Sequence, residues 1–233
     1  MTKRAGYRHA QPADGREVRQ LRRELAGVRK ETRAGAEQGS VIRGMSAVFY
    51  RADDPGTEYW LWDDMVERLM PGCFDRAISE SHDARALFNH DSSQLLGRVS
   101  SGTCRLAVDD VGLSYEIDAD PSDPDHQRVA AKIDRADVTG SSFGFIARSV
   151  RWTEQKLDDG SWLMIREVLD VDLFDVGPVT WPAYDGTTAG RSQSERAEPT
   201  GERHSLLIER DAQLRPAEDE AVRMRLRLIE LDR

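Results

Sequence analysis

The sequence is poor in the residues that build metal sites and disulfides. Cys73 and Cys104 are its two cysteines among 233 residues, and its five histidines form no close pair. A zinc site could be drawn from Cys73, His82, His90 and Cys104, but the short spacings that preorganise such sites are missing. We therefore expect no metal and no cofactor. Two cysteines without an apolar leader predict reduced thiols in a cytoplasmic setting.

Long apolar runs and phosphate-binding loops are also absent. No segment reaches the roughly 20 apolar residues that a membrane-spanning helix needs. No glycine-rich phosphate loop follows a strand-like segment, which disfavours nucleotide binding. The net charge of -9 argues against nucleic-acid binding by the whole chain. We expect neither a membrane nor a nucleic acid as partner.

Charged residues are abundant and unevenly distributed. They make up 32% of the chain, so part of it is expected to be solvated or disordered. Before residue 40, ten basic residues outnumber five acidic ones. Residues 1–40 are predicted to form a basic arm that is partly helical, through weak helical spacing over 16–30, or disordered. Residues 186–215 resemble a linker, and residues 216–233 are predicted to form a charged helix.

The central part, residues 41–185, has the pattern of one domain. Strand-like runs alternate with turn signals, and they lie at 41–50, 58–62, 84–89, 103–108, 112–119, 142–152 and 162–176. Helical patterns occur at 71–80, where Pro71 suits the first turn, and at 124–136. This pattern predicts a mainly β, α+β fold, built as a closed or partly closed β-barrel with helices outside.

Two segments place a reactive side chain in an otherwise apolar run. His90 ends the run Leu-Phe-Asn-His-Asp, and Ser142 lies in Gly-Ser-Ser-Phe-Gly-Phe. A serine hydroxyl needs a base within hydrogen-bond reach to become a nucleophile, and histidine titrates in the useful range. Each residue alone is more often structural. The serine segment is not a nucleophile elbow, because a strand-like run follows it rather than a helix.

A third segment adds a carboxylate. Asp175 lies between Phe174 and Val176, and burying a carboxylate there is costly without a partner. Asp172 and Asp170 precede it closely and could present carboxylates on the same face. A third group would have to orient the imidazole of a serine hydrolase. Pairing of His90 with one of these acids is expected, and which one stays open.

In their order along the chain, eight short motifs resemble the prohead protease family of tailed bacteriophages, of the type that matures HK97-like capsids. The matching segments are residues 44–49, 71–74 (Pro-Gly-Cys-Phe), 87–91, 96–98 (Leu-Gly-Arg), 112–113 (Gly-Leu), 142–145 (Ser-Phe-Gly-Phe), 173–177 and 182–183 (Pro-Ala). The resemblance spans roughly residues 41–185. Each motif is weak alone, but the ordered set is specific.

The resemblance implies a serine endopeptidase with a fold similar to herpesvirus assemblins. It makes His90 the base and Ser142 the nucleophile, and the family's glutamate falls on Asp175, which is one methylene shorter. Gly177 stands where the family has serine, which puts the local strand geometry in question. Backbone N–H groups would hold the oxyanion, and residues near Arg148 are our expectation for them.

The resemblance also implies partners and a setting. The implied substrates are the scaffolding region of the major capsid protein and the protease itself, inside the assembling prohead in the host cytoplasm. By analogy with assemblins we expect a homodimer or higher oligomer. The competing hypothesis is a non-enzymatic, scaffold-like capsid assembly protein that keeps the protease fold. Its basis is the charged sequence outside the core and the altered third residue.

Overall fold

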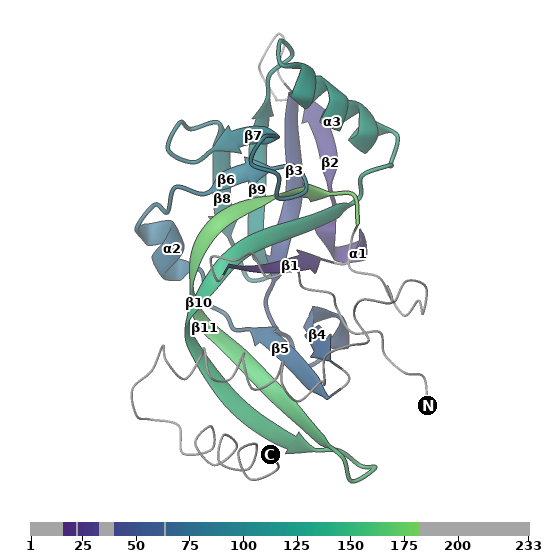
Figure 1. The fold of residues 1–233 in the computed structure, drawn as a ribbon, viewed down its shortest axis with the longest axis vertical. Coiled ribbons are helices and arrows are strands. Elements are labelled where there is room, and N and C mark those ends of the chain that lie inside the picture. The colour runs from purple at the N-terminus through teal and green to yellow at the C-terminus, as the bar shows by residue number, and fades with distance from the viewer. Residues whose placement is uncertain (1–15, 22, 33–39, 63, 182–233) are drawn as a thin grey trace.

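Two β-sheets organise the described part of the chain (Figure 1). The computed structural model describes residues 16–21, 23–32, 40–62 and 64–181. In chain order the elements are β1 (Glu17–Leu21), α1 (Arg23–Ala26), β2 (Arg29–Thr32), β3 (Ser40–Val48), η1 (Pro55–Thr57), β4 (Tyr59–Trp62), β5 (Met65–Leu69), α2 (Asp75–Ser79), β6 (Arg85–Leu87), β7 (Leu95–Arg98), β8 (Cys104–Val108), β9 (Gly112–Ala119), α3 (Pro124–Asp134), β10 (Gly140–Lys156) and β11 (Trp162–Val179).

The larger sheet is built around the β10–β11 hairpin. Its path is β1-β10-β11-β5-β4, and β6 pairs with both β11 and β7. β10 and β11 are antiparallel along nearly their whole length, whereas β5 and β6 run parallel to β11 at its two ends. Both long strands curve through the molecule, and the turn that joins them lies at the bottom of the view in Figure 1. β11 therefore pairs with three other strands, β10, β5 and β6.

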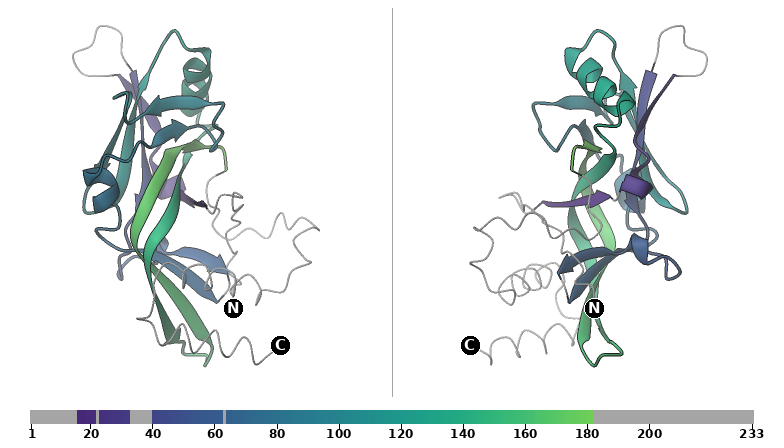
Figure 2. Two further views of the ribbon diagram at one scale, coloured as in Figure 1. Left: turned by 60° about the vertical axis from the view of Figure 1, so that its left-hand side comes forward. Right: turned by 90° about the vertical axis from the view of Figure 1, so that its right-hand side faces the viewer.

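The smaller sheet, of order β2-β3-β9-β8, is antiparallel throughout. Turned views show it as a separate layer beside the upper part of the β10–β11 ribbon, with α3 at one end (Figure 2). Apolar side chains of both sheets form one main core. In that core Phe143 stacks on Phe145 at 4.9 Å between ring centroids, and Phe74 meets Phe143 edge-on at 5.6 Å.

The predicted mainly β fold with few helices is confirmed. The strands of the described residues form two sheets, and no closed barrel is found among them. The central strand predictions correspond to β3, β4, β6, β8, β9, β10 and β11, and the helix over 124–136 corresponds to α3. The helix predicted from residue 71 begins only at Asp75, because residues 71–74 form a turn. β5 and β7 were not predicted.

The expected arm contributes strands to both sheets. β1 pairs with β10, and β2 pairs with β3, so the predicted helix over 16–30 is wrong apart from the short α1. Glu17 and Arg19 are buried in β1, although a sequence pattern reads charged residues as exposed. Ionic partners elsewhere in the fold compensate that burial. The linker over 186–215 and the helix over 216–233 lie outside the described residues.

Candidate active site

His90 lies in a tight turn directly after β6. Asn89 and His90 both have left-handed backbone conformations, with φ of 57° and 59°, and asparagine tolerates this conformation better than most residues. The turn is tied to the end of β11, because Asn89 N–H donates to the Pro178 carbonyl at 3.1 Å and Thr180 N–H donates to Asn89 Oδ1 at 2.8 Å. The backbone thus fixes where the imidazole stands.

Ser142 lies on β10, opposite Gly177 of β11. Side chains alternate along a strand, so Phe143 and Phe145 face the core while Ser142 faces the other side. Its Oγ is 2.6 Å from His90 Nε2 and donates to the Arg19 carbonyl at 2.8 Å. The residue is fully buried beneath β1.

Asp175 of β11 stands opposite Gly144 and contacts the other imidazole nitrogen. Its Oδ1 forms a short hydrogen bond with His90 Nδ1, and its side chain is almost completely buried. A Cβ at position 144 would collide with Asp175 Oδ2, so the glycine provides the space that the carboxylate occupies. The aspartate reaches the imidazole although it is shorter than the family's glutamate.

Gly177 is a second glycine at which two backbone segments lie close together. Its φ is +153°, and a Cβ there would run into the carbonyl oxygen of Leu87, the last residue of β6. Glycine lets β11 and the end of β6 meet closely. β11 continues through Gly177 and Pro178 to Val179, so the strand geometry is preserved at this departure from the family pattern.

The three side chains form one hydrogen-bonded row: Asp175, His90, Ser142. When Nδ1–H donates to the carboxylate, Nε2 can accept the serine proton once that proton turns away from the Arg19 carbonyl. The buried carboxylate has its partner in the imidazole. Such a row can activate a hydroxyl for attack on a carbonyl carbon.

The two other acids of the β11 segment, Asp170 and Asp172, form ion pairs with arginines. Arg76 of α2 donates to Asp170 at 2.9 Å and to Asp172 at 2.8 Å, and Arg148 also pairs with Asp172. Burial acts to raise the pKa of Asp172, but Arg148 and Arg76 outweigh it and bring the pKa below its ordinary value. Neither acid bonds to His90 in this arrangement.

Arg148 does not stand beside Ser142. It lies six residues further along β10, which corresponds to about 20 Å of strand, and more than half of its side chain is exposed. That residues near Arg148 hold the oxyanion stays a prediction.

The residues considered for zinc do not gather. Both cysteines are buried free thiols; burial raises the pKa of Cys73 far above its ordinary value and that of Cys104 to about 12. His82 Nε2 lies 3.2 Å from Glu80 on the surface, while His90 faces Asp175. Within the described ranges no group of three or more His, Cys, Asp or Glu side chains is arranged to hold a metal ion.

Comparison with known protein families identifies the family of the chain. A family model described as caudovirus prohead serine protease matches residues 27–201. The chain belongs to this family. Membership assigns it to the serine peptidases and to a protease role in prohead maturation, and it implies contact with capsid proteins. Neither the curated proteins nor the solved structures contain a significant match to the chain.

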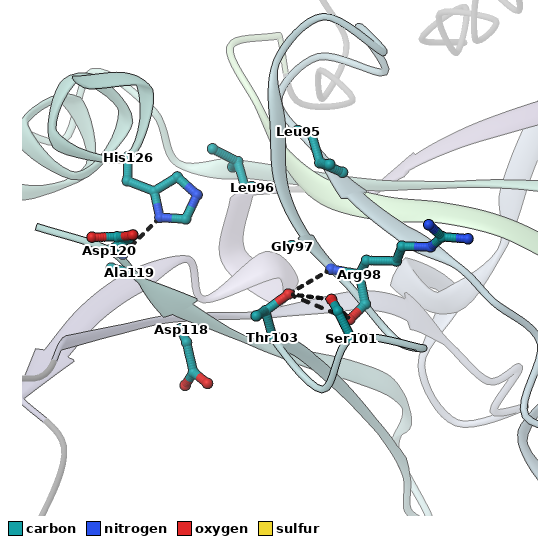
Figure 3. A pocket seen from close by; sticks show the side chains of 10 residues that line it. All are labelled: Leu95, Leu96, Gly97, Arg98, Ser101, Thr103, Asp118, Ala119, Asp120 and His126. Atoms are coloured by element: carbon teal, nitrogen blue, oxygen red, sulfur yellow. Dashed lines mark hydrogen bonds between the residues drawn. The ribbon is translucent and has the colours of Figure 1, made fainter. Parts of the chain in front are cut away.

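Further features of this prohead protease lie away from the hydrogen-bonded row. A groove of about 430 Å³ runs between β7, the end of β9 and His126 of α3 (Figure 3). His126 Nδ1 accepts a hydrogen bond from Asp120 N–H at 2.8 Å there (Figure 3). None of the three residues of the row lines this groove. Over the part of the chain described, no helix has the length and apolar character needed to cross a membrane.

A buried ionic cluster that includes Arg19, the residue whose carbonyl contacts Ser142, was not predicted. Arg19 bonds to Glu67 of β5 at 2.5 and 2.8 Å and to Glu17 at 2.6 Å, while Arg166 of β11 pairs with both glutamates. The one signal in the sequence was the period-two spacing of Glu17 and Arg19.

Proposed function

We propose that the protein is a serine endopeptidase that cleaves the scaffolding region of the capsid protein and its own chain during prohead maturation. Ser142 is the nucleophile, His90 the general base and Asp175 the residue that orients the imidazole. One observation carries this proposal: a single imidazole contacts a buried carboxylate through Nδ1 and a serine hydroxyl through Nε2. Family membership supports the same reaction class.

The reaction follows from this arrangement. Ser142 Oγ attacks a peptide carbonyl carbon while His90 Nε2 takes its proton, and Asp175 stabilises the imidazolium. The intermediate collapses when the C–N bond breaks and His90 returns the proton to the leaving amine. Water then hydrolyses the acyl-enzyme by the same route, with His90 again as base.

Replacement of the nucleophile tests the proposal. Ser142→Ala should abolish processing of co-expressed capsid protein, measured by intact-mass spectrometry, because the acyl-enzyme forms on Ser142 Oγ. Ser141→Ala is the matched control: Ser141 is equally buried, but its Oγ bonds to the Gly177 carbonyl and Tyr115 instead of His90. Unchanged processing in Ser142→Ala, with its melting temperature preserved, would contradict the proposal.

The alternative is a non-enzymatic assembly protein, and the complete burial of Ser142 favours it. A serine-reactive fluorophosphonate separates the two functions. An enzyme should be labelled at Ser142, and His90→Ala should prevent the labelling. An assembly protein that only retains the fold should show no labelling in either form.

A further inference from the structure

β1 occupies the one edge of β10 that β11 leaves open near Ser142. It runs antiparallel to β10, with Gln20 opposite Ser142 and Arg19 opposite Phe143. Figure 1 shows it beside the upper part of β10, on the side away from β11. Proteins commonly bind an extended peptide by adding it as a strand to a sheet edge. β1 therefore has the placement of a bound peptide.

The backbone of β1 also presents a particular peptide bond to the nucleophile. Ser142 Oγ donates to the Arg19 carbonyl oxygen at 2.8 Å while it lies 2.6 Å from His90 Nε2. The carbonyl carbon of Arg19 lies only one C=O bond, about 1.2 Å, beyond the oxygen that Ser142 contacts. The bond between Arg19 and Gln20 is thus the β1 bond nearest the reactive group. Attack needs the carbonyl to turn so that its carbon faces Oγ.

The Arg19 side chain fills a pocket that matches a guanidinium. Glu67 receives two hydrogen bonds from it, at 2.5 and 2.8 Å, and Phe145 presents its ring face 5.2 Å from the guanidinium carbon. The planar fork of arginine suits two-point carboxylate recognition, and its cation suits an aromatic face. Glu67 and Arg19 are both completely buried. Lysine could not reproduce this pair of contacts.

Charge balance in the pocket involves one more residue of β1. Apart from β1, the pocket holds Glu67 paired with Arg166. Arg19 adds a second buried cation beside this pair, and a buried cation is costly unless carboxylates compensate it. Glu17, two residues earlier and on the same face of the strand, bonds to both Arg19 and Arg166. The pocket therefore favours an acidic residue two positions before the arginine.

We propose that β1 is the protease's own substrate strand, that the enzyme cleaves between Arg19 and Gln20, and that it selects an arginine before the scissile bond with an acid two positions earlier. This inference rests on the proposed serine endopeptidase activity. An ester bond forms between Ser142 Oγ and the Arg19 carbonyl carbon as the Arg19–Gln20 C–N bond breaks. The serine proton passes through His90 to the Gln20 amine, and water releases Arg19 as a carboxylate. Loss of residues 1–19 opens the β10 edge to other substrates.

Self-cleavage is tested on the full chain. Intact-mass spectrometry should show a new N-terminus at Gln20 and a fragment of residues 1–19, and Ser142→Ala should yield neither. Arg19→Ala should reduce the rate of this cut at least tenfold. Arg23→Ala, which removes an exposed arginine of α1, is the matched control and should be cut as the parent is. An intact N-terminus in a parent chain that still processes capsid protein would overturn the inference and leave the proposed function standing.

Selectivity is tested in trans with the parent chain, so that folding of an Arg19 variant does not matter. A peptide library from a digested proteome should be cut after arginine, with acidic residues enriched two positions earlier. Cleavage without a preference for arginine would overturn the inference alone. Absence of library cleavage by a chain whose Ser142 reacts with fluorophosphonate would overturn it too. Absence of both cleavage and labelling would overturn the inference together with the proposed function.

Discussion

Two carboxylates of β11, Asp172 and Asp175, lie three residues apart and serve different chemistry. Asp175 is enclosed and meets one imidazole, whereas Asp172 sits between the guanidinium groups of Arg76 and Arg148. Both acids oppose positions two apart on β10, Gly144 and Ile146, because a β-bulge between them shifts the register. The oxygens of Asp172 already accept hydrogen bonds from two guanidinium groups. Such a carboxylate has few acceptor positions left with which to orient an imidazole. Both residues are aspartates of the same strand, so their different roles follow from the side chains that surround each of them.

The strongest test of this comparison exchanges the two carboxylates for amides. Asp175→Asn should reduce kcat about 10⁴-fold, because an amide no longer holds the required imidazole tautomer. Asp172→Asn should leave kcat within about twofold of the parent, since Asp172 contacts no group of the row. Rates of peptide cleavage and of fluorophosphonate labelling measure both effects. Equal losses in the two variants would contradict the assignment of the third role to Asp175.

A smaller effect is expected when the space for Asp175 is filled. In Gly144→Ala the new methyl group would collide with Asp175 Oδ2 and push the carboxylate from His90. A displacement of about 1 Å can cost roughly 10²-fold in rate, so kcat should fall by that order. Ala147→Gly, at a buried position of the same strand, should lower the melting temperature with kcat unchanged. Full activity in Gly144→Ala would show that the carboxylate tolerates displacement.

The smallest effect concerns stability in acid. The pKa of Asp172 is lowered in the folded protein, relative to about 3.9 in an unfolded chain. Its stabilising contribution is therefore complete above about pH 4 and is lost as the pH falls through the lower folded pKa. Urea unfolding between pH 2 and pH 6 should show a shallower acid dependence in Asp172→Asn, with Arg148→Ala between variant and parent. Identical profiles would show that the ion pairs contribute nothing.

Sequence patterns predicted the apolar strands well because their side chains alternate or form continuous runs that bury against the core. They also located His90, Ser142 and Asp175 through the family resemblance, and their catalytic roles stay predictions. The structure brings the three side chains together through pairings that no local pattern encodes, such as β6 beside β11. The bulge near Asp175 is equally invisible to a simple alternation rule.

Sequence patterns failed where buried charges compensate one another. Glu17, Arg19, Glu67 and Arg166 read singly as surface residues, yet all four are buried in one cluster. Removing one partner of such a cluster typically costs about 3–5 kcal/mol, because the charge left behind stays buried and unpaired. Residues 17–21 are therefore packed into the sheet of the uncut chain, although charge composition alone predicted an arm.

The position of β11 in the chain has a consequence for the order of synthesis. β11 is the last strand of the described residues, and it pairs with β10, β5 and β6 and carries Asp175. Asp175 and His90 are 85 positions apart, and His90 and Ser142 are 52 apart. Contacts this distant in sequence form late, after the long loops between them have closed. A nascent chain of 142 to 161 residues thus contains the nucleophile and the base but lacks the carboxylate and the strand β11 that aligns them.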